Sequence, residues 1–322
     1  MNKTLLVTGI GGNVAQGIIR TIRHLYPKFK VIGTNAKFVS AGNFLCDEVI
    51  EVPMSYADNY IDKMIEICNH HDVDLIIPAT DYETYYLAKN RDLLPTVACS
   101  DDTTSEIFLK KSLTHQVFKK HGIPFASTDF PSKYKGEFKN IIVKPDEGRG
   151  SSGIHINPDN LYTFDDSYII QELIVGTEIT TAFYVTKSNE LLGQITMVRH
   201  LHNGTTVLSE VVMKYDHKMT DILQKIIRVI PIKGSCNIQC IVSESGEIIP
   251  FEINGRISGT NSIRANFGFE DVKYTLQEYL LNEVPDKPII KKGSAARILM
   301  DIIYPDISIS EISNNSNTSY IY

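Results

Sequence analysis

The stretch that predicts most about this fold is residues 235–256, SCNIQCIVSESGEIIPFEINGR. Its two β-rich runs, residues 235–242 and 247–253, flank a short polar turn that contains glycine, a pattern that predicts a β-hairpin. Glu252 and Asn254 have the same parity, so both side chains leave one face of the second strand. The hairpin is therefore expected to present polar side chains together on one face.

The polar side chains of this hairpin are of the kind that binds magnesium. Gln239, Glu252 and Asn254 supply amide and carboxylate oxygens, which Mg²⁺ prefers and commonly shares with phosphate. Arg256, again of the same parity, can donate to phosphate oxygens. The spacing predicts a site for a metal-bound triphosphate. The alternative interpretation is an amphipathic hairpin whose polar face is simply solvated.

Composition and charge narrow the class of protein. The chain has 322 residues, 43% of them hydrophobic, which is enough for two or three packed units. Its 32 basic and 38 acidic residues are mixed along the chain, which argues against nucleic acid or an anionic membrane as partner. No apolar stretch approaches the roughly 18 residues of a membrane helix, and no signal peptide is recognisable, so a cytoplasmic location is expected. The 5 cysteines form no Cys-x-x-Cys pair and are expected to be buried free thiols.

The order of predicted elements differs between the two parts of the chain. Strand and helix patterns alternate through the first hundred residues, which predicts βαβ units and a parallel sheet. Paired strands dominate later, so we expect an α/β chain that is α+β in its C-terminal part. Helices are expected at residues 14–25, 56–70, 82–90, 105–121, 220–229 and 271–280. The expected segments are residues 1–104, 105–172, 173–307 and a fraying tail, 308–322.

Two glycine-rich turns follow apolar strands. The turn from Gly9 to Gly17 opens a helix, a setting in which backbone amides can approach phosphate. Its spacing departs from Gly-x-Gly-x-x-Gly and no acidic ribose ligand follows the second strand, so a turn that lines a substrate cleft is favoured over NAD binding. The second turn, residues 146–153, follows Lys144 and can fold over phosphates that this lysine contacts. A mobile loop without a ligand is the alternative.

The order of these motifs resembles the ATP-grasp superfamily over nearly the whole chain. The resemblance rests on Lys111, Lys144 with its loop, Gln171-Glu172, Glu178 and the hairpin at residues 239–256. It is strongest to the carbamoyl-phosphate-synthase-like branch and its short relatives. There, a Rossmann-like pre-ATP-grasp domain that helps to hold substrate precedes two ATP-grasp subdomains. The resemblance implies that residues 1–104 are that domain, with the lid loop in residues 105–172 and the metal site in residues 173–307.

The resemblance also implies roles for individual residues. ATP phosphates would contact Lys111 and Lys144, and the lid over them would be Gly148, Arg149, Gly150, Ser151, Ser152 and Gly153. Adenine would lie beside Gln171, Glu172 and Leu173, and the ribose beside Glu178. One or two Mg²⁺ ions, for which Mn²⁺ can substitute, would be held by Gln239, Glu252 and Asn254. Arg256 and Lys144 would be the catalytic residues, with Arg256 steadying the transferred phosphoryl group.

The activity implied by the resemblance is an ATP-dependent carboxylate–amine ligase that forms an acyl phosphate and ADP. Arginine can bind a carboxylate bidentately and an acidic side chain can meet an amine. The candidate substrate contacts of these two kinds are Arg199, Arg264, Arg297, Asp81 and Glu83. Each arginine, taken singly, is better explained by a structural or surface ion pair. The chain departs from many amino-acid ligases because little sequence follows Met300, so the acceptor pocket stays unassigned.

Three rival functions stay open at this point. The first is a kinase of the same fold that releases a phosphorylated small molecule. The second is an NAD(P)-dependent oxidoreductase that uses the turn from Gly9 to Gly17. The third is a nucleotide-sensing or scaffold protein without turnover. The prevalence of twofold homo-oligomers favours a homodimer.

Overall fold

A five-stranded parallel sheet forms the first part of the molecule. The computed structural model describes residues 3–148, 152–202 and 204–322. The strand order is β3-β2-β1-β4-β5, and each neighbouring pair runs parallel, as the alternating pattern predicted. The strands are β1 (Thr4–Val7), β2 (Lys30–Asn35), β3 (Glu48–Glu51), β4 (Leu75–Ile77) and β5 (Thr96–Val97). The helices beside them are α1 (Asn13–Leu25), α2 (Tyr60–His70) and α3 (Asp81–Lys89).

Helices cover both faces of this sheet, which explains the continuous apolar runs of its strands. Leu5 on β1 belongs to a cluster with Ile18 of α1, whereas the next residue, Leu6, belongs to a cluster with Met64 of α2. The cluster on the α1 side also contains Leu276 of α8 (Asp271–Leu276), a helix from the C-terminal half of the chain. The first sheet is thereby packed against the C-terminal half.

A small antiparallel sheet follows, in the order β6-β9-β7-β8, preceded by two helices. Its strands are β6 (Thr128–Asp129), β7 (Ile141–Pro145), β8 (His155–Ile156) and β9 (Tyr168–Glu172). The expected single helix over residues 105–121 is wrong, because α4 (Asp102–Leu109) and α5 (Lys111–Lys120) are separated at Lys110, which is extended. The first amides of α5 donate to Asp146 instead of continuing α4: Lys111 N to its carbonyl at 3.3 Å and Ser112 N to its side chain at 2.7 Å.

The largest sheet is antiparallel and six-stranded, in the order β14-β13-β10-β11-β12-β15. Its strands are β10 (Gly176–Val185), β11 (Leu191–His202), β12 (Thr205–Val211), β13 (Gly234–Ser243), β14 (Ile248–Asn254) and β15 (Ser294–Ala296). The predicted hairpin is confirmed as β13 and β14, with Gln239 opposite Glu252 and Asn237 opposite Asn254. The helix α6 (Asp216–Val229) packs its apolar side, including Met219 and Leu223, into the core under this sheet.

The remaining elements are short. After β14 come α7 (Asn261–Arg264), the 3-10 turn η4 (Ala265–Phe267), α8 and a π turn, η5 (Gln277–Leu281). The other 3-10 turns are η1 (Ala41–Leu45), η2 (Arg91–Leu93), η3 (Leu161–Thr163) and η6 (Ile309–Glu311). At the C-terminus β16 (Ile302–Ile303) pairs with β17 (Tyr320–Ile321), and Asn315 N donates to Cys46 O at 2.9 Å. The tail therefore contacts the first domain, in contrast to the fraying expected for it.

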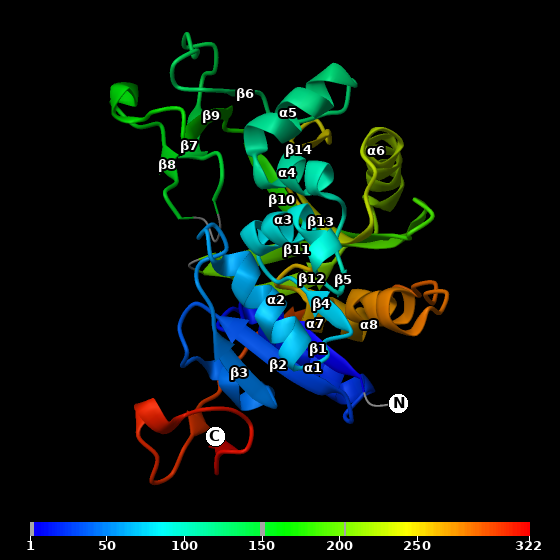
Figure 1. The fold of residues 1–322 in the computed structure, drawn as a ribbon. Coiled ribbons are helices and arrows are strands. Elements are labelled where there is room, and N and C mark those ends of the chain that lie inside the picture. The colour runs from blue at the N-terminus through cyan, green and yellow to red at the C-terminus, as the bar shows by residue number, and fades with distance from the viewer. Residues whose placement is uncertain (1–2, 149–151, 203) are drawn as a thin grey trace.

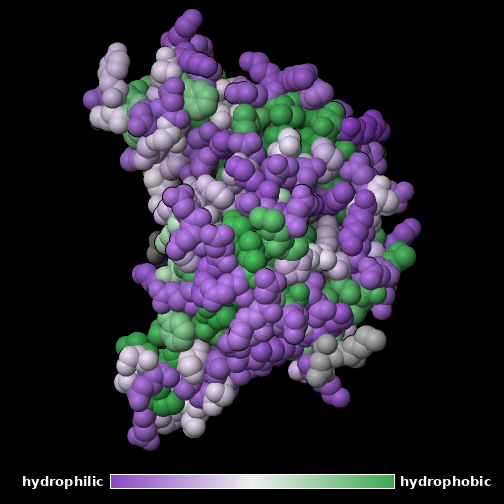
Figure 2. All heavy atoms as spheres, viewed as in Figure 1, coloured by the Kyte–Doolittle hydropathy of each residue, from purple (hydrophilic) through white to green (hydrophobic). Residues whose placement is uncertain are grey.

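Figure 1 shows how these parts are arranged, with the parallel sheet below, the lobe of β7, β8 and β9 at the upper left and the six-stranded sheet between them. The face seen in Figure 2 is mostly hydrophilic, with smaller apolar areas. Among the described ranges, every helix falls short of the length and apolarity that crossing a membrane requires. The 5 cysteines are free and buried, as predicted. The exact segment boundaries stay a prediction.

Candidate functional site

A row of polar side chains crosses four adjacent strands of the six-stranded sheet. Glu252 of β14 lies opposite Gln239 of β13, and Glu178 and Arg199 continue the row on β10 and β11. Arg199 Nη2 donates to Glu178 Oε1 at 2.6 Å and to Gln239 Oε1 at 2.8 Å. The alternation of side chains along antiparallel strands brings all four to one face of the sheet.

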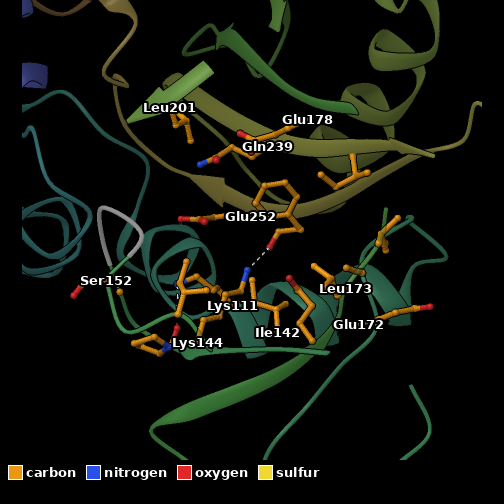
Figure 3. Close-up of a pocket in the computed structure, with 18 residues that line it drawn as sticks. Lys111, Ile142, Lys144, Ser152, Glu172, Leu173, Glu178, Leu201, Gln239 and Glu252 are labelled. Carbon is orange, nitrogen blue, oxygen red and sulfur yellow. Dashed lines mark hydrogen bonds between the residues drawn. The ribbon is translucent and has the colours of Figure 1, made fainter. Parts of the chain in front are cut away.

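Two buried lysines form the opposite wall (Figure 3). Lys144, near the end of β7, lies with its Nζ 3.4 Å from the carbonyl oxygen of Phe251 and 5.2 Å from the centroid of that ring. Lys111, the first residue of α5, donates from Nζ to the carbonyls of Pro145 and Asp146 at 3.3 and 3.1 Å. The break before α5 therefore places the Lys111 ammonium beside the strand that carries Lys144.

The pKa values of Lys144 and Glu252 are both shifted from their ordinary values. Burial lowers the pKa of Lys144 to about 8, although the negative charge of Glu252 opposes the shift. Burial raises the pKa of Glu252, but Lys111 and Lys144, with an Asn254 hydrogen bond and Arg256, outweigh it and hold that pKa below its ordinary value. Two cations facing one anion leave an excess of positive charge, which favours an anionic ligand such as phosphate.

The two walls enclose a cavity of about 260 Å³. It is lined by ten of the predicted nucleotide and metal residues: Lys111, Lys144, Gly148, Ser152, Gln171, Glu172, Leu173, Glu178, Gln239 and Glu252. Gln171 is buried and donates from Nε2 to Thr128 Oγ1 at 2.9 Å. Gly153 lines a different cavity beside the first domain. The predicted lid residues Arg149, Gly150 and Ser151 lie outside the described residues.

The apolar residues that line this cavity were not predicted from the sequence. Ile142 on β7, Ile241 on β13 and Phe251 on β14 line it together with Leu201 of β11. Such walls suit a flat heterocycle, because apolar side chains bury a ring and a few polar groups orient it. The strand pattern could have identified two of them. Ile241 has the same parity as Gln239, and Ile142 has the same parity as Lys144, so each points to the same face as its polar neighbour.

A second cavity of about 570 Å³ adjoins the first and shares Gln239, Glu252, Gly148 and Leu201 with it. Asn254, Arg256, Asp81 and Arg199 line it, and so do Gly9, Gly11 and Gly12 of the first glycine turn. This glycine turn therefore lines a cleft, as predicted from the sequence. Arg256 Nη2 lies 2.7 Å from Asp81 Oδ2, and the two side chains are only 14% and 13% exposed. This ion pair joins the end of β14 to the start of α3.

Three predicted substrate residues lie elsewhere. Arg264 is fully buried, where it pairs with Asp271 and donates to Ser258 Oγ at 2.7 Å and Thr260 Oγ1 at 2.8 Å. The interpretation of Arg264 as a substrate contact is therefore wrong, since its guanidinium is enclosed in the core. Glu83 is also buried and accepts from Thr8 and Thr80. Arg297 Nη2 donates to the carbonyl of Gly259 at 2.7 Å, behind the second cavity.

The donors around Glu252 suit a hard cation. Gln239, Glu252 and Asn254 present oxygen atoms on neighbouring strands, and Asn254 Nδ2 donates to Glu252 Oε1 at 3.3 Å. Such a set with two amides leaves room for phosphate oxygens, which Mg²⁺ commonly takes as ligands. Within the described part of the chain, no group of three or more His, Cys, Asp or Glu side chains is placed to bind a metal.

Two protein-family models match the chain. Residues 5–99 match the PylC-like N-terminal domain, and residues 109–260 match the ATP-grasp domain. A comparison with curated protein sequences finds no match.

Solved structures share this architecture at low sequence identity. N5-carboxyaminoimidazole synthetase from Staphylococcus aureus, complexed with ADP, superposes with a TM-score of 0.75 and 11% identity, covering 93% of this chain and 83% of that one. The biotin carboxylase domain of Hydrogenobacter thermophilus 2-oxoglutarate carboxylase, with MgADP and bicarbonate, gives 0.70 and 16%, covering 91% and 73%. N5-carboxyaminoimidazole ribonucleotide synthetase from Thermotoga maritima gives 0.67 and 16%, covering 89% and 78%. At these identities the likeness establishes the fold.

Proposed function

Because residues 109–260 match the ATP-grasp domain, we propose that this chain is an ATP-dependent ligase that joins a carboxylate to an amine through an acyl phosphate. One observation carries the proposal. Lys111 and Lys144 face Glu252 and Gln239 across a cavity that opens into a second cavity lined by Arg256. The first cavity suits a nucleotide and the second suits the molecules that react with its terminal phosphate.

The nucleotide would lie in the first cavity in one orientation. Its base would lie among the apolar residues near Gln171 and Leu173, and its ribose hydroxyls would donate to Glu178. The phosphates would then reach Lys111 and Lys144, whose charges stabilise them most in the absence of water. Mg²⁺ would be held by Gln239, Glu252 and Asn254, where it supplies neutralisation of phosphate charge.

The chemistry needs positioning more than a nucleophilic side chain. A carboxylate oxygen of the acid attacks the γ-phosphorus, the bond from that phosphorus to ADP breaks, and the product is an acyl phosphate. The amine nitrogen then attacks the acyl carbon, the carbon–oxygen bond to phosphate breaks, and the amine loses a proton. Arg256, which lines the second cavity, would stabilise the negative charge of the transferring phosphoryl group.

Several relatives of this fold bind the ligands that the proposal requires. The structural neighbours include complexes with ADP, with MgADP and with a bicarbonate anion. The proposal extends nucleotide and magnesium binding to this chain because its own lysines and oxygen donors are arranged to accept them. The acid, the amine and a homodimeric state remain predictions.

The test is a matrix of small acids and amines, including amino acids, screened for magnesium-dependent ADP formation with products identified by mass. A ligase gives ADP, phosphate and an amide only when an acid and an amine are both present. A phosphorylated product that accumulates without any amine would show the kinase of the same fold. Tight NADH binding without magnesium-dependent ATP binding would contradict both.

A further inference from the structure

Arg199 occupies two oxygens that the proposed nucleotide site needs. Its Nη2 donates to Glu178 Oε1 at 2.6 Å and to Gln239 Oε1 at 2.8 Å. Glu178 is the proposed partner of the ribose, and Gln239 is a proposed magnesium ligand. The ion pair is half-buried, with side-chain exposures of 13% for Arg199 and 32% for Glu178. Both side-chain oxygens therefore already accept a hydrogen bond from a cationic side chain of the protein.

The position of Arg199 connects the two cavities. Glu178 lines the nucleotide cavity, Arg199 lines the second cavity, and Gln239 lines both. Arg199 Nε is buried and has no hydrogen-bond partner among the described residues, so the guanidinium has unused donor capacity. An arginine with a spare donor on the wall of a cavity is suited to bind a planar oxyanion.

Magnesium and nucleotide would compete with Arg199 for its partners. A divalent cation on Gln239 Oε1 would repel a guanidinium that lies 2.8 Å from the same atom. Ribose hydroxyls that donate to Glu178 would weaken the other hydrogen bond of Arg199, the one to Glu178. In the second cavity, the carboxylate of Asp81 is already paired with Arg256 at 2.7 Å. Glu252, the other carboxylate that lines this cavity, is a proposed magnesium ligand. The displaced guanidinium would therefore need an anion from outside the protein.

We propose that Arg199 binds the carboxylate of the acid substrate and becomes available for it when the magnesium nucleotide takes Glu178 and Gln239. The inference rests on the proposed function and adds a binding order to it, with nucleotide before acid. Because coupling between two ligands is reciprocal, an acid held by Arg199 also tightens nucleotide binding. The acid would then bind beside the position of the γ-phosphate only when a magnesium nucleotide is in place.

Calorimetric titration with MgADP tests the competition without knowledge of the substrate. Arg199→Gln removes the competing cation, so MgADP should bind about three- to tenfold more tightly than to the wild type. With 2′,3′-dideoxy-ADP the gain should be smaller, because that nucleotide cannot donate to Glu178. Arg297→Gln is the matched control, since Arg297 donates to a backbone carbonyl, and it should leave the affinity for MgADP unchanged.

A second titration tests the anion. MgADP is titrated in high concentrations of acetate, glycine or bicarbonate, and at least one should tighten its binding to the wild type and to Arg297→Gln but not to Arg199→Gln. Unchanged or weaker MgADP binding by Arg199→Gln would overturn the competition. No tightening by any of the three anions would overturn the carboxylate assignment. If the wild type binds no MgADP, the proposed function itself fails, and that outcome is distinct from both.

Discussion

Lys144 combines burial with a position beside the proposed phosphates, and this makes nucleotide binding sensitive to pH. Burial lowers its pKa to about 8, so the lysine loses its charge just above neutrality. A bound phosphate favours the charged form and raises that pKa. The affinity for MgADP should therefore be constant below about pH 8 and fall by up to about tenfold per pH unit above it.

The measurement is the dissociation constant of MgADP between about pH 7 and pH 9.5. Lys144→Met should bind weakly at every pH and show no such decline. Lys144→Arg, which keeps its charge through this range, should lose the decline but not the binding. A wild-type affinity that does not change across the range would contradict the role of the Lys144 charge.

Glu252 is the residue on which the proposed metal site depends most. Glu252→Ala removes the carboxylate that faces both lysines, and magnesium-dependent ADP formation should fall at least about hundredfold. Glu247→Gln is the matched control, because Glu247 is an exposed carboxylate next to the turn of the same hairpin. Circular dichroism of both variants should match the wild type. Full activity of Glu252→Ala would remove this residue from the site.

Arg264 has a structural role that sequence could not distinguish from a substrate role. Arg264→Met leaves the Asp271 carboxylate buried without its partner, and should lower the free energy of unfolding by about 3–5 kcal/mol. Arg297→Met, at a half-buried site, should cost about 1 kcal/mol or less. Urea denaturation measures both. Equal losses in the two variants would contradict the role given to the buried pair.

Residue types and spacing predicted which side chains lie together in much of the candidate site, because strand periodicity determines their positions. Glu252 and Asn254 converge since a strand repeats every two residues, and their partner Gln239 lies across one tight turn. The sequence did not separate Arg199 from Arg264, because burial depends on the whole fold. It also did not predict the contact between Arg199 and Glu178, which requires the register of β10 and β11.

At the scale of elements, the start of α5 determines where the Lys111 ammonium lies. Asp146 accepts from Ser112 N and from Ser112 Oγ, each at 2.7 Å, and its own carbonyl accepts from Lys111 Nζ at 3.1 Å. The carboxylate thus satisfies free amides at the helix N-terminus, as a capping residue does. This contact joins the start of α5, which precedes β7, to the loop that follows β7.

Asp146→Ala should lower the free energy of unfolding by about 1–3 kcal/mol, because a buried amide and hydroxyl lose their acceptor. It should also weaken MgADP binding, because the lost side-chain contacts hold in place the loop whose backbone carbonyl positions Lys111. Ser112→Ala removes only the hydroxyl and should cost about 0.5–1.5 kcal/mol. Denaturation and calorimetry measure the two effects. A larger loss for Ser112→Ala than for Asp146→Ala would contradict this account of the helix start.

Most strands and helices were predictable, whereas the break between α4 and α5 was not. Ile107, Phe108, Val117 and Phe118 fit one continuous helical pattern, and nothing near Lys110 interrupts it. The break depends on Asp146, which is 34 residues from Ser112 in sequence. Local periodicity carries no information about such a partner.

At the scale of the whole molecule, the first domain supplies one side of the second cavity. Arg256 at the end of β14 pairs with Asp81 of α3, 175 residues earlier in the chain. The glycine turn before α1 lines the same cavity, and α8 packs beside α1. The order of motifs predicted the two kinds of domain. It could not predict which residues face each other across them, because that depends on how the domains pack.

The central claim is that the acid is activated by phosphorylation in the cavity between these domains. The most direct test uses the acid and amine found in the screen, with the carboxylate of the acid labelled with ¹⁸O. An acyl phosphate intermediate requires that one labelled oxygen leave with the phosphate, so mass spectrometry should find one ¹⁸O atom in the released phosphate. Phosphate that contains no ¹⁸O, formed together with the amide, would contradict the claim.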